Sequence, residues 1–316
     1  MSGGLLTEAF LTALLTGAVT AGVPLLLAGL GEQMSQKAGV LNIGLEGMML
    51  AGAYAGFIVT LHMGASPWGA AAGLGAALGA GLLAGAVMAG LAVRLGLNQI
   101  VIGIALLLGL EGLTAILHHL SFAQSYPRLP AAASWAAPGL AHLPLIGPAV
   151  FDRPPMVHVA LLLVPLCAAL YRLTHAGLAL RAAGDGPRAL DAAGGNVRRV
   201  RTVAVLAAGA LAGLGGGFMA IVGAGVFVPF MTNGAGFIAI VLAMLARGRP
   251  LLVLAGALLF GGCLSAATAL QVAGVDAPTD IVQMLPFAAV LLVLALFGRR
   301  GALPAALGET WDRERT

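Results

Sequence analysis

The chain alternates between long apolar runs and short polar breaks. A helix needs about 20 apolar residues to cross a bilayer. Nine runs approach this length, and they cover residues 5–30, 40–63, 67–93, 100–120, 156–173, 202–222, 230–246, 251–272 and 281–297. The seventh run follows a polar stretch that contains a proline, so we expect a short or bent helix there. The pattern predicts an all-α polytopic membrane protein with about 8–10 transmembrane helices in a single domain over residues 1–316.

Two of the breaks are long. Residues 121–155 hold seven prolines, which argues against a continuous helix, although Tyr126 and Trp135 suit a short segment at the membrane surface. Residues 174–201 are strongly charged and must lie in water. Within them, Asp185 is a candidate N-cap and Pro187 suits a first turn, so we expect a short helix at residues 188–193 that ends at Gly194-Gly195. Such an exposed helix between two membrane spans has the form of a docking element.

The composition supports the membrane class and gives an orientation. The 316 residues are 60% hydrophobic and 9% charged, whereas soluble domains carry about 25% charge. If residues 174–201 are cytoplasmic, only Arg128 and Arg153 of the sixteen basic residues fall outside, as the positive-inside rule requires. We therefore expect a multi-pass protein of the cell inner (plasma) membrane. Its N-terminus and the loop at residues 121–155 would be external, and its tail at residues 299–316 would be cytoplasmic.

The residues give no catalytic constellation. The zinc-protease and serine-hydrolase motifs are absent, and Cys167 and Cys263 both lie in apolar runs, where they are typical of small buried hydrophobic residues. No metal site is expected. A phosphate-binding loop needs lysine directly after glycine, but Lys37, the single lysine, follows Gln36. We predict that the chain is not an enzyme, that it binds no cofactor, and that any ATP is bound by another chain.

Polar residues at membrane depth are the candidates for function. Asn42 and Glu46 stand among glycines at the start of the second run, after a short polar exit at residues 31–37. This arrangement suggests a broken helix that lines a cavity. The alternative is a structural knot in which Glu46 bonds neighbouring backbone. Asn98 and Gln99 either face the same pathway or cap the fourth helix.

Three further groups leave alternative interpretations open. Asn233, before the seventh run, either touches substrate or satisfies a bend. Glu111 lies within the fourth run with His118 and His119 further on. These residues either form a proton relay, make interior hydrogen bonds, or lie at the membrane interface. The third run has glycines at a spacing that favours close helix packing. These are Gly75, Gly79, Gly81 and Gly85.

Four stretches of the sequence resemble one family. They are KAGVLNIGLEGMMLAGAYAG at residues 37–56, LNQIVIGIALLL at residues 97–108, the charged break with the following helix at residues 177–220, and GAGFIAIVLAMLARGRP at residues 234–250. Their residue patterns resemble those of ABC-transporter permeases of the branched-chain amino acid, ribose and nucleoside type. The run NIGLEGMML is most similar to the nucleoside and simple-sugar branch.

The resemblance implies an import permease for nucleosides or related purine and sugar compounds. In the family, two permease chains, identical or related, enclose the substrate path, two ATPase chains with ATP and Mg dock on coupling helices, and an extracytoplasmic binding protein delivers substrate. The ATPase contact would then consist of Arg188, Asp191, Ala192, Ala193 and Gly194. Gly195 departs from the family, which commonly has a larger apolar residue there.

The substrate pathway would be lined by polar residues near the broken helices. These are Asn42, Glu46, Asn98, Gln99 and Asn233. The alternative function is a proton-coupled secondary transporter that uses Glu46 or Glu111.

Overall fold

The fold is a bundle of long apolar helices. The computed structural model describes residues 8–64, 66, 68–136, 139, 145–272, 284, 288–289, 291–292, 295 and 303–312. Six helices in these residues are long and apolar enough to span a membrane. They are α1 (Glu8–Lys37), α2 (Leu45–Met63), α3 (Gly69–Met88) with a π-helical continuation (Ala89–Arg94), α4 (Gln99–Phe122), α5 (Pro155–Leu173), and α8 (Val197–Phe218) with a π-helical continuation (Met219–Ala224). Two further apolar helices are α9 (Ala235–Leu245) and α10 (Pro250–Val272).

The predicted fold class is therefore confirmed, and most predicted spans agree with a helix. The predicted ninth run lies mostly outside the described residues. The first span is longer than predicted. The supposed polar exit at residues 31–37 belongs to α1, which is helical to Lys37. That prediction was wrong because Glu32, Gln33, Ser35 and Gln36 are buried by other parts of the chain and have no need of water.

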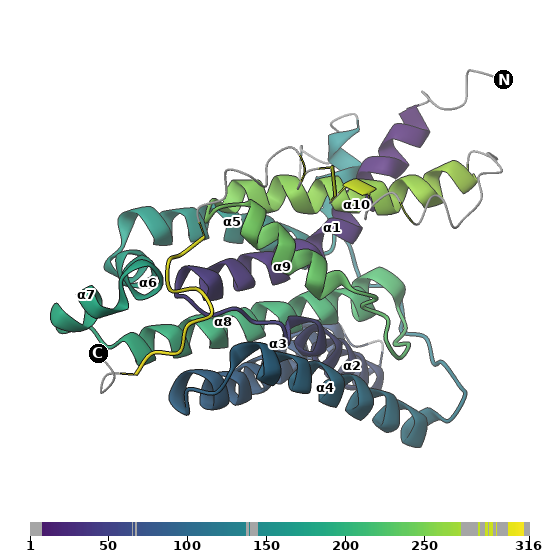
Figure 1. Cartoon of the computed structure of the whole chain (residues 1–316). Coiled ribbons are helices and arrows are strands. Elements are labelled where there is room, and N and C mark those ends of the chain that lie inside the picture. The colour runs from purple at the N-terminus through teal and green to yellow at the C-terminus, as the bar shows by residue number, and fades with distance from the viewer. Residues whose placement is uncertain are drawn as a thin grey trace.

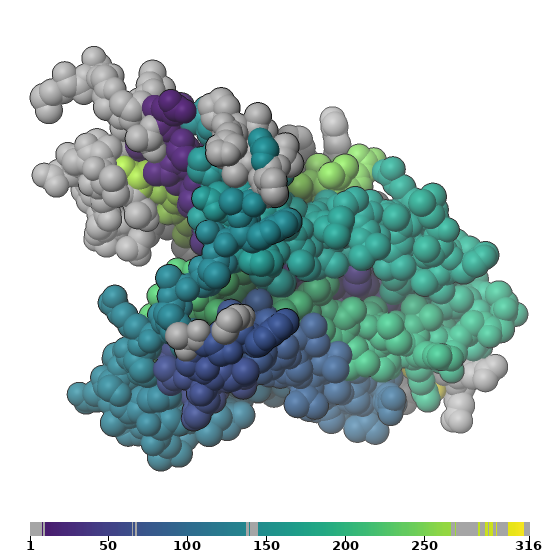
Figure 2. Space-filling view, turned by 180° about the vertical axis from the view of Figure 1, so that it is seen from behind, coloured from purple at the N-terminus to yellow at the C-terminus, as the bar shows by residue number. Residues whose placement is uncertain are grey.

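Helices α2 and α8 form the centre of the bundle. In each, 61% of the most apolar window is buried, against 17% in α4 and 28% in α5. The helices α1, α2 and α3 pack against α8, and α4 lies on the outer side of α2 (Figure 1). Viewed from behind, α3 and α4 line one side of the molecule in blue, and α5 and α6 (His175–Asp185) line the other in teal (Figure 2). The apolar outer faces of α4 and α5 suit contact with lipid or with a second chain.

Glycines set the close approach of α3 to α8. A Cβ atom at Gly81 would collide with the backbones of Gly209 and Gly213, so a larger residue there must separate the two helices. A Cβ at Gly75 or Gly79 would meet nothing within 4 Å in this chain. The predicted packing face is therefore made by the second glycine pair of α3, while the first pair faces open space.

Helix α9 is too short to cross a membrane. Its 11 residues extend about 16 Å, roughly half of a 30 Å hydrocarbon core. The preceding residues 225–234 contain no helix, so the chain returns into the bundle as irregular backbone before α9 begins. The expected short helix is confirmed, although it begins at Ala235. The helix is covered by α1, α2 and α10.

Most of the described residues of the proline-rich break lie outside regular helices. The break contains a two-residue antiparallel pairing of β1 (Trp135–Ala136) with β2 (Asp152–Arg153), and a π-helical turn (Gly147–Phe151). The N–H of Leu129 donates to the carbonyl of Gly225 at 2.7 Å, and Arg153 donates to the hydroxyl of Thr20 in α1. These bonds fasten the break to α1 and to the chain that follows α8.

A segment near the C-terminus folds back onto the bundle (yellow in Figure 1). In residues 303–312, the N–H of Ala306 donates to the carbonyl of Gly184, and that of Gly308 donates to the carbonyl of Gly39. The guanidinium of Arg201, 2% exposed, donates to the carbonyls of Glu309 (2.6 Å) and Ala183 (3.2 Å). The prediction that the charged break lies wholly in water is therefore wrong at Arg201, whose charge is satisfied by carbonyl groups inside the protein.

The helix contact gives a direct test. We expect Gly81→Val to destabilise the chain by about 1–3 kcal/mol, because the added side chain must push α3 away from α8. Gly75→Val, on the same helix but facing open space, is the matched control. Thermal unfolding in detergent, followed by size-exclusion chromatography, measures both. Equal melting temperatures for the two variants would contradict this packing.

The buried arginine gives a second test. Arg201→Ala removes the side-chain donor to the Ala183 carbonyl and the shorter of two side-chain bonds to the Glu309 carbonyl. We expect it to cost about 1–3 kcal/mol and to release residues 303–312. Arg199→Ala, two residues earlier on an exposed part of α8, should behave as wild type. Limited proteolysis followed by mass spectrometry reports the release. C-terminal cleavage at the same rate in both variants would show that Arg201 does not hold the segment.

Candidate functional site

A two-helix projection forms one end of the molecule. It consists of α6 and α7 (Pro187–Ala192), and α7 lies at its tip (Figure 1). The hydroxyl of Thr174 caps α6 by accepting from the N–H of Gly177 at 3.1 Å. Asp185 is the last residue of α6 and Gly186 is the N-cap of α7, without a side-chain bond. The prediction of Asp185 as N-cap was wrong, because α6 extends further than expected.

The tip of the projection is open to solvent. No residue of α7 is buried. Gly194 has a φ of 82°, which ends the helix as predicted. A Cβ at Gly195 would collide with the side chain of Leu190, so the small residue at this position lets Leu190 fold over the helix end. The residues predicted for ATPase contact all lie at this tip. Arg188, Ala192, Ala193 and Gly194 are exposed and Asp191 is half-buried.

A second group of polar residues lies inside the bundle, where α1 ends. We call Glu32, Gln33, Gln36 and Asn42 the polar knot; their exposed fractions are between 0% and 4%. Gln36 donates to Glu32 at 3.0 Å and to the carbonyl of Ile240 in α9 at 3.4 Å. The same oxygen of Glu32 accepts from the N–H of Asn42 at 3.3 Å. The knot therefore joins α1, the loop after it, and α9.

The polar knot contains more hydrogen-bonding groups than it satisfies. Oε2 of Glu32, both amide atoms of Gln33 and Oδ1 of Asn42 have no partner among the described residues. Buried polar groups are normally paired, and each unpaired one costs about 1–3 kcal/mol. Four such atoms together are typical of a place that holds water or a ligand in another state. The sequence pattern indicated Asn42, but the polarity of residues 31–37 predicted a loop where its partner Glu32 lies in α1.

Glu46 satisfies the start of α9. Its carboxylate accepts from the N–H groups of Gly234 at 2.8 Å and Gly236 at 2.5 Å. A Cβ at Gly236 would collide with the backbone of Glu46, so α2 and α9 touch directly here. The carboxylate lies at the positive end of the α9 dipole, which favours its charge. This bonding agrees with the structural-knot interpretation of Glu46, and it does not test contact with substrate.

Two of the other predicted pathway residues lie near Asn42 and Glu46. Gln99 bonds Leu41, directly before Asn42, and Asn233 precedes Gly234, which Glu46 binds. Asn98 lies at the exposed start of α4. Asn98 caps α4 by accepting from the N–H groups of its first turn. Gln99 is buried, accepts from the N–H of Leu41 at 2.9 Å and donates to the carbonyl of Glu309 at 3.4 Å. Asn233 is exposed, with a φ of 43°, in the turn before α9. Their roles in a pathway stay predictions, and their contacts as described are within the protein.

The residues proposed for a proton relay do not form one in the described structure. His118 is buried and stacks on Tyr126, with 5.2 Å between ring centroids, while His119 is exposed. Glu111 is half-buried in α4, and no hydrogen bond among the described residues connects it to either histidine. His118 instead belongs to an aromatic cluster with Phe122 and Phe227.

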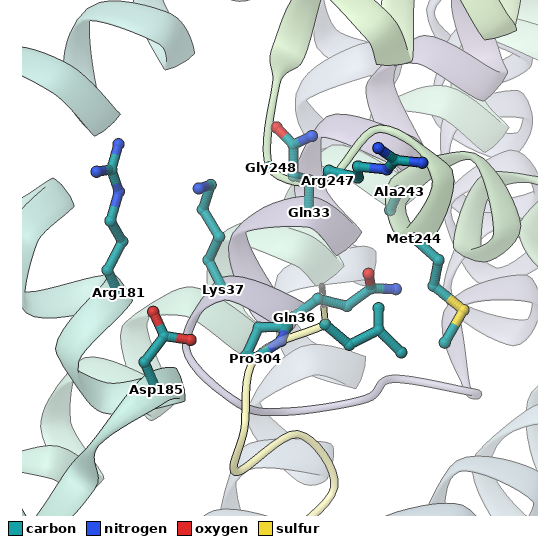
Figure 3. A pocket seen from close by; sticks show the side chains of 11 residues that line it. Gln33, Gln36, Lys37, Arg181, Asp185, Ala243, Met244, Arg247, Gly248 and Pro304 are labelled. Atoms are coloured by element: carbon teal, nitrogen blue, oxygen red, sulfur yellow. The ribbon is translucent and has the colours of Figure 1, made fainter. Parts of the chain in front are cut away.

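A cavity of about 160 Å³ lies beside the polar knot. Gln33, Gln36 and Lys37 of α1 form its floor, and Figure 3 shows Arg181 and Asp185 of α6 on one side and Arg247 on the other. Its wall is completed by Ala243, Met244, Gly248, Leu303 and Pro304. The cavity is therefore surrounded by the polar knot, the projection, α9 and the C-terminal segment. A movement of any of these elements changes the shape of the cavity.

Comparison with known proteins agrees with the resemblance. A family model described as "Branched-chain amino acid transport system / permease component" matches residues 14–294. The putative glucose ABC transporter permease of Haloferax volcanii is 38% identical over 254 residues, which cover 80% of this chain and 76% of the relative. No solved structure gives a significant match.

Two further relatives are named for nucleosides. The guanosine ABC transporter permease of Bacillus subtilis is 30% identical over 297 residues, covering 90% of this chain and 92% of the relative. The nucleoside ABC transporter permease of Lactococcus lactis is 29% identical over 307 residues, covering 92% and 94%. The chain therefore belongs to this permease family, and it is a multi-pass membrane permease subunit of an ABC importer.

Proposed function

We propose that this chain forms one half of the membrane pore of an ATP-driven importer for uncharged nucleosides or closely related purine and sugar compounds. Two permease chains, identical or related, form the pore. Separate ATPase subunits bind ATP and Mg, and an extracytoplasmic binding protein delivers substrate. The observation that carries the proposal is the exposed α7 at the tip of the projection, because a carrier that needs no partner has no use for it.

Few contacts separate the proposed ATPase-binding tip from the cavity, and backbone atoms make most of them. α6 contacts the end of α1 so closely that a Cβ at Gly184 would collide with the carbonyl of Lys37. Arg201 and the C-terminal segment connect α6 to Gly39. A displacement of α7 by the ATPase would therefore move α6 and the end of α1 together. Transport follows if ATP and substrate bind the outward-open and inward-open arrangements with different affinity.

The orientation is supported by where the basic residues gather. Lys37, Arg181 and Arg247 line the cavity of Figure 3. A neighbouring cavity is lined by Arg94 and Arg188, together with Arg198 and Arg201. These residues come from six different parts of the chain but lie at the same end of the bundle as α7. By the positive-inside rule this end is cytoplasmic, which gives an external N-terminus and a cytoplasmic C-terminus.

The substrate class is supported by the state of the α9 N-terminus. In transporters with broken helices, such an N-terminus often binds an anionic group of the substrate. Here Glu46 occupies it, so a substrate carboxylate has no place there. The unpaired groups nearby include both amide atoms of Gln33 and Oδ1 of Asn42, which suit the uncharged donor and acceptor edges of a nucleoside. This favours the nucleosides and sugars named for the relatives over amino acids.

The proposed coupling contact can be tested in the intact complex. We expect the double variant Ala192→Glu, Ala193→Glu to reduce co-purification of the ATPase by at least about tenfold, because two buried like charges strongly disfavour an interface. Ala192→Ser, Ala193→Ser keeps both residues small and is the matched control. Quantitative mass spectrometry of the affinity-purified chain measures the ratio. Equal ATPase recovery with both variants would remove α7 from the contact.

The role of Glu46 can be separated from that of Glu111. We expect Glu46→Ala to lower nucleoside uptake by at least about tenfold, with the complex still assembled, because two N–H groups of α9 lose their acceptor. Glu111→Gln should transport normally, since ATP and not a proton relay drives uptake. Uptake of labelled nucleoside by whole cells reports both. Normal uptake by the Glu46 variant, or loss of uptake in the Glu111 variant, argues against this mechanism.

A further inference from the structure

A second, larger cavity lies between the end of α5 and the start of α10. Its volume is about 480 Å³. Five cationic side chains from four parts of the chain line it, and no carboxylate is found among its described lining residues. The cations are Lys37 at the end of α1, Arg172 at the end of α5, Arg181 of α6, and Arg247 and Arg249 in the turn before α10. Asp185 lies beside Lys37 and Arg181 in the adjoining cavity and offsets part of this charge. The cluster still has more cations than carboxylates around it, and this excess of positive charge suits an anionic ligand.

Tyr171 holds part of this cluster in place. The Lys37 ammonium lies 4.6 Å from the centre of the Tyr171 ring, a cation–π contact, and Arg181 donates to the Tyr171 carbonyl at 3.0 Å. The tyrosine is 4% exposed, and its hydroxyl has no hydrogen-bond partner among the described residues. Tyr171 lines the cavity, so its unpaired hydroxyl is our candidate donor for a phosphate oxygen.

The other side of the cavity is apolar. Ala168 of α5 and Leu251 and Leu252 of α10 contribute to its lining. Leu251 is 65% exposed. Pro165, which is exposed, and Leu161, which is half-buried, lie one and two turns before Ala168 on the same face of α5 and continue an apolar surface along that helix. The cavity thus joins a cationic cluster to a surface suited to acyl chains. An anionic phospholipid has the complementary combination, a negatively charged phosphate joined to apolar acyl chains.

We propose that this cavity binds one anionic phospholipid, with its phosphate among the five cations and its acyl chains along α5 and α10. Arginine matches phosphate oxygens in a planar, two-pronged geometry, and lysine adds a point charge. Basic pockets between membrane helices bind anionic headgroups by this chemistry. Arginines that served only to orient the chain would need nothing but water, whereas these converge on one cavity. An acidic surface of a partner protein would not use the apolar side.

The test uses the full-length chain in mild detergent. Native mass spectrometry with phosphatidylglycerol and with phosphatidylcholine of the same acyl chains measures the retention of each lipid. We expect phosphatidylglycerol to be retained preferentially, and Arg172→Gln, Arg249→Gln to weaken its binding on the order of 30-fold, since each cation near the membrane surface contributes roughly a factor of five. Arg198→Gln, Arg199→Gln, which removes two exposed arginines elsewhere, should retain the lipid as wild type does.

Two further arms make the result decisive. Tyr171→Phe keeps the ring over Lys37 and removes only the hydroxyl; we expect roughly fivefold weaker binding, and this variant carries the test if the double variant does not fold. Millimolar inorganic phosphate should leave the lipid bound. The proposal is overturned by equal retention of both lipids, by unchanged affinity in the folded double variant, or by displacement with phosphate alone. It is also overturned if the double variant loses the ATPase while it keeps the lipid. None of these readouts depends on transport.

Discussion

The bond between Glu46 and the start of α9 is the interaction on which the rest of the site depends. A helix that begins inside a membrane exposes backbone N–H groups, and lipid offers them no acceptor. Glu46 satisfies Gly234 and Gly236 and joins α2 to α9 where Gly236 leaves no room for a side chain. A short α9 is stable in the bundle because this carboxylate is present. The unpaired groups of the neighbouring polar knot are those that we propose for an uncharged substrate.

The coupling end of the molecule depends on backbone contacts in the same way. Gly184 touches the end of α1, the C-terminal segment bonds Gly184 and Gly39, and Arg201 holds that segment from inside the bundle. The polar knot begins at Glu32, within the last two turns of α1. Tightly packed elements therefore connect α6 to the cavity, so a displacement of α6 also moves the wall of the cavity. Packed elements of this kind transmit movement as a change between two arrangements.

Local signals in the sequence predicted the elements that glycine and proline define. The short helix after Pro187 and the short α9 were both expected from such residues. Prediction from the sequence failed where a residue far away in the chain determines whether a side chain is buried. Arg201 stands in a charged run, but one of its acceptors is the carbonyl of Glu309, 108 residues later. Residues 31–37 have the polarity of a loop, and only their burial against α9 and the following turn keeps them helical.

The most direct measurement is nucleoside uptake into proteoliposomes that contain this chain with its partner permease and ATPase. The binding protein is added outside, and ATP with Mg is enclosed inside. We predict uptake that requires enclosed ATP and continues when an uncoupler abolishes the proton gradient. Uptake that stops with the uncoupler while ATP is maintained, or that proceeds without ATP, would contradict the account and favour a proton-coupled carrier.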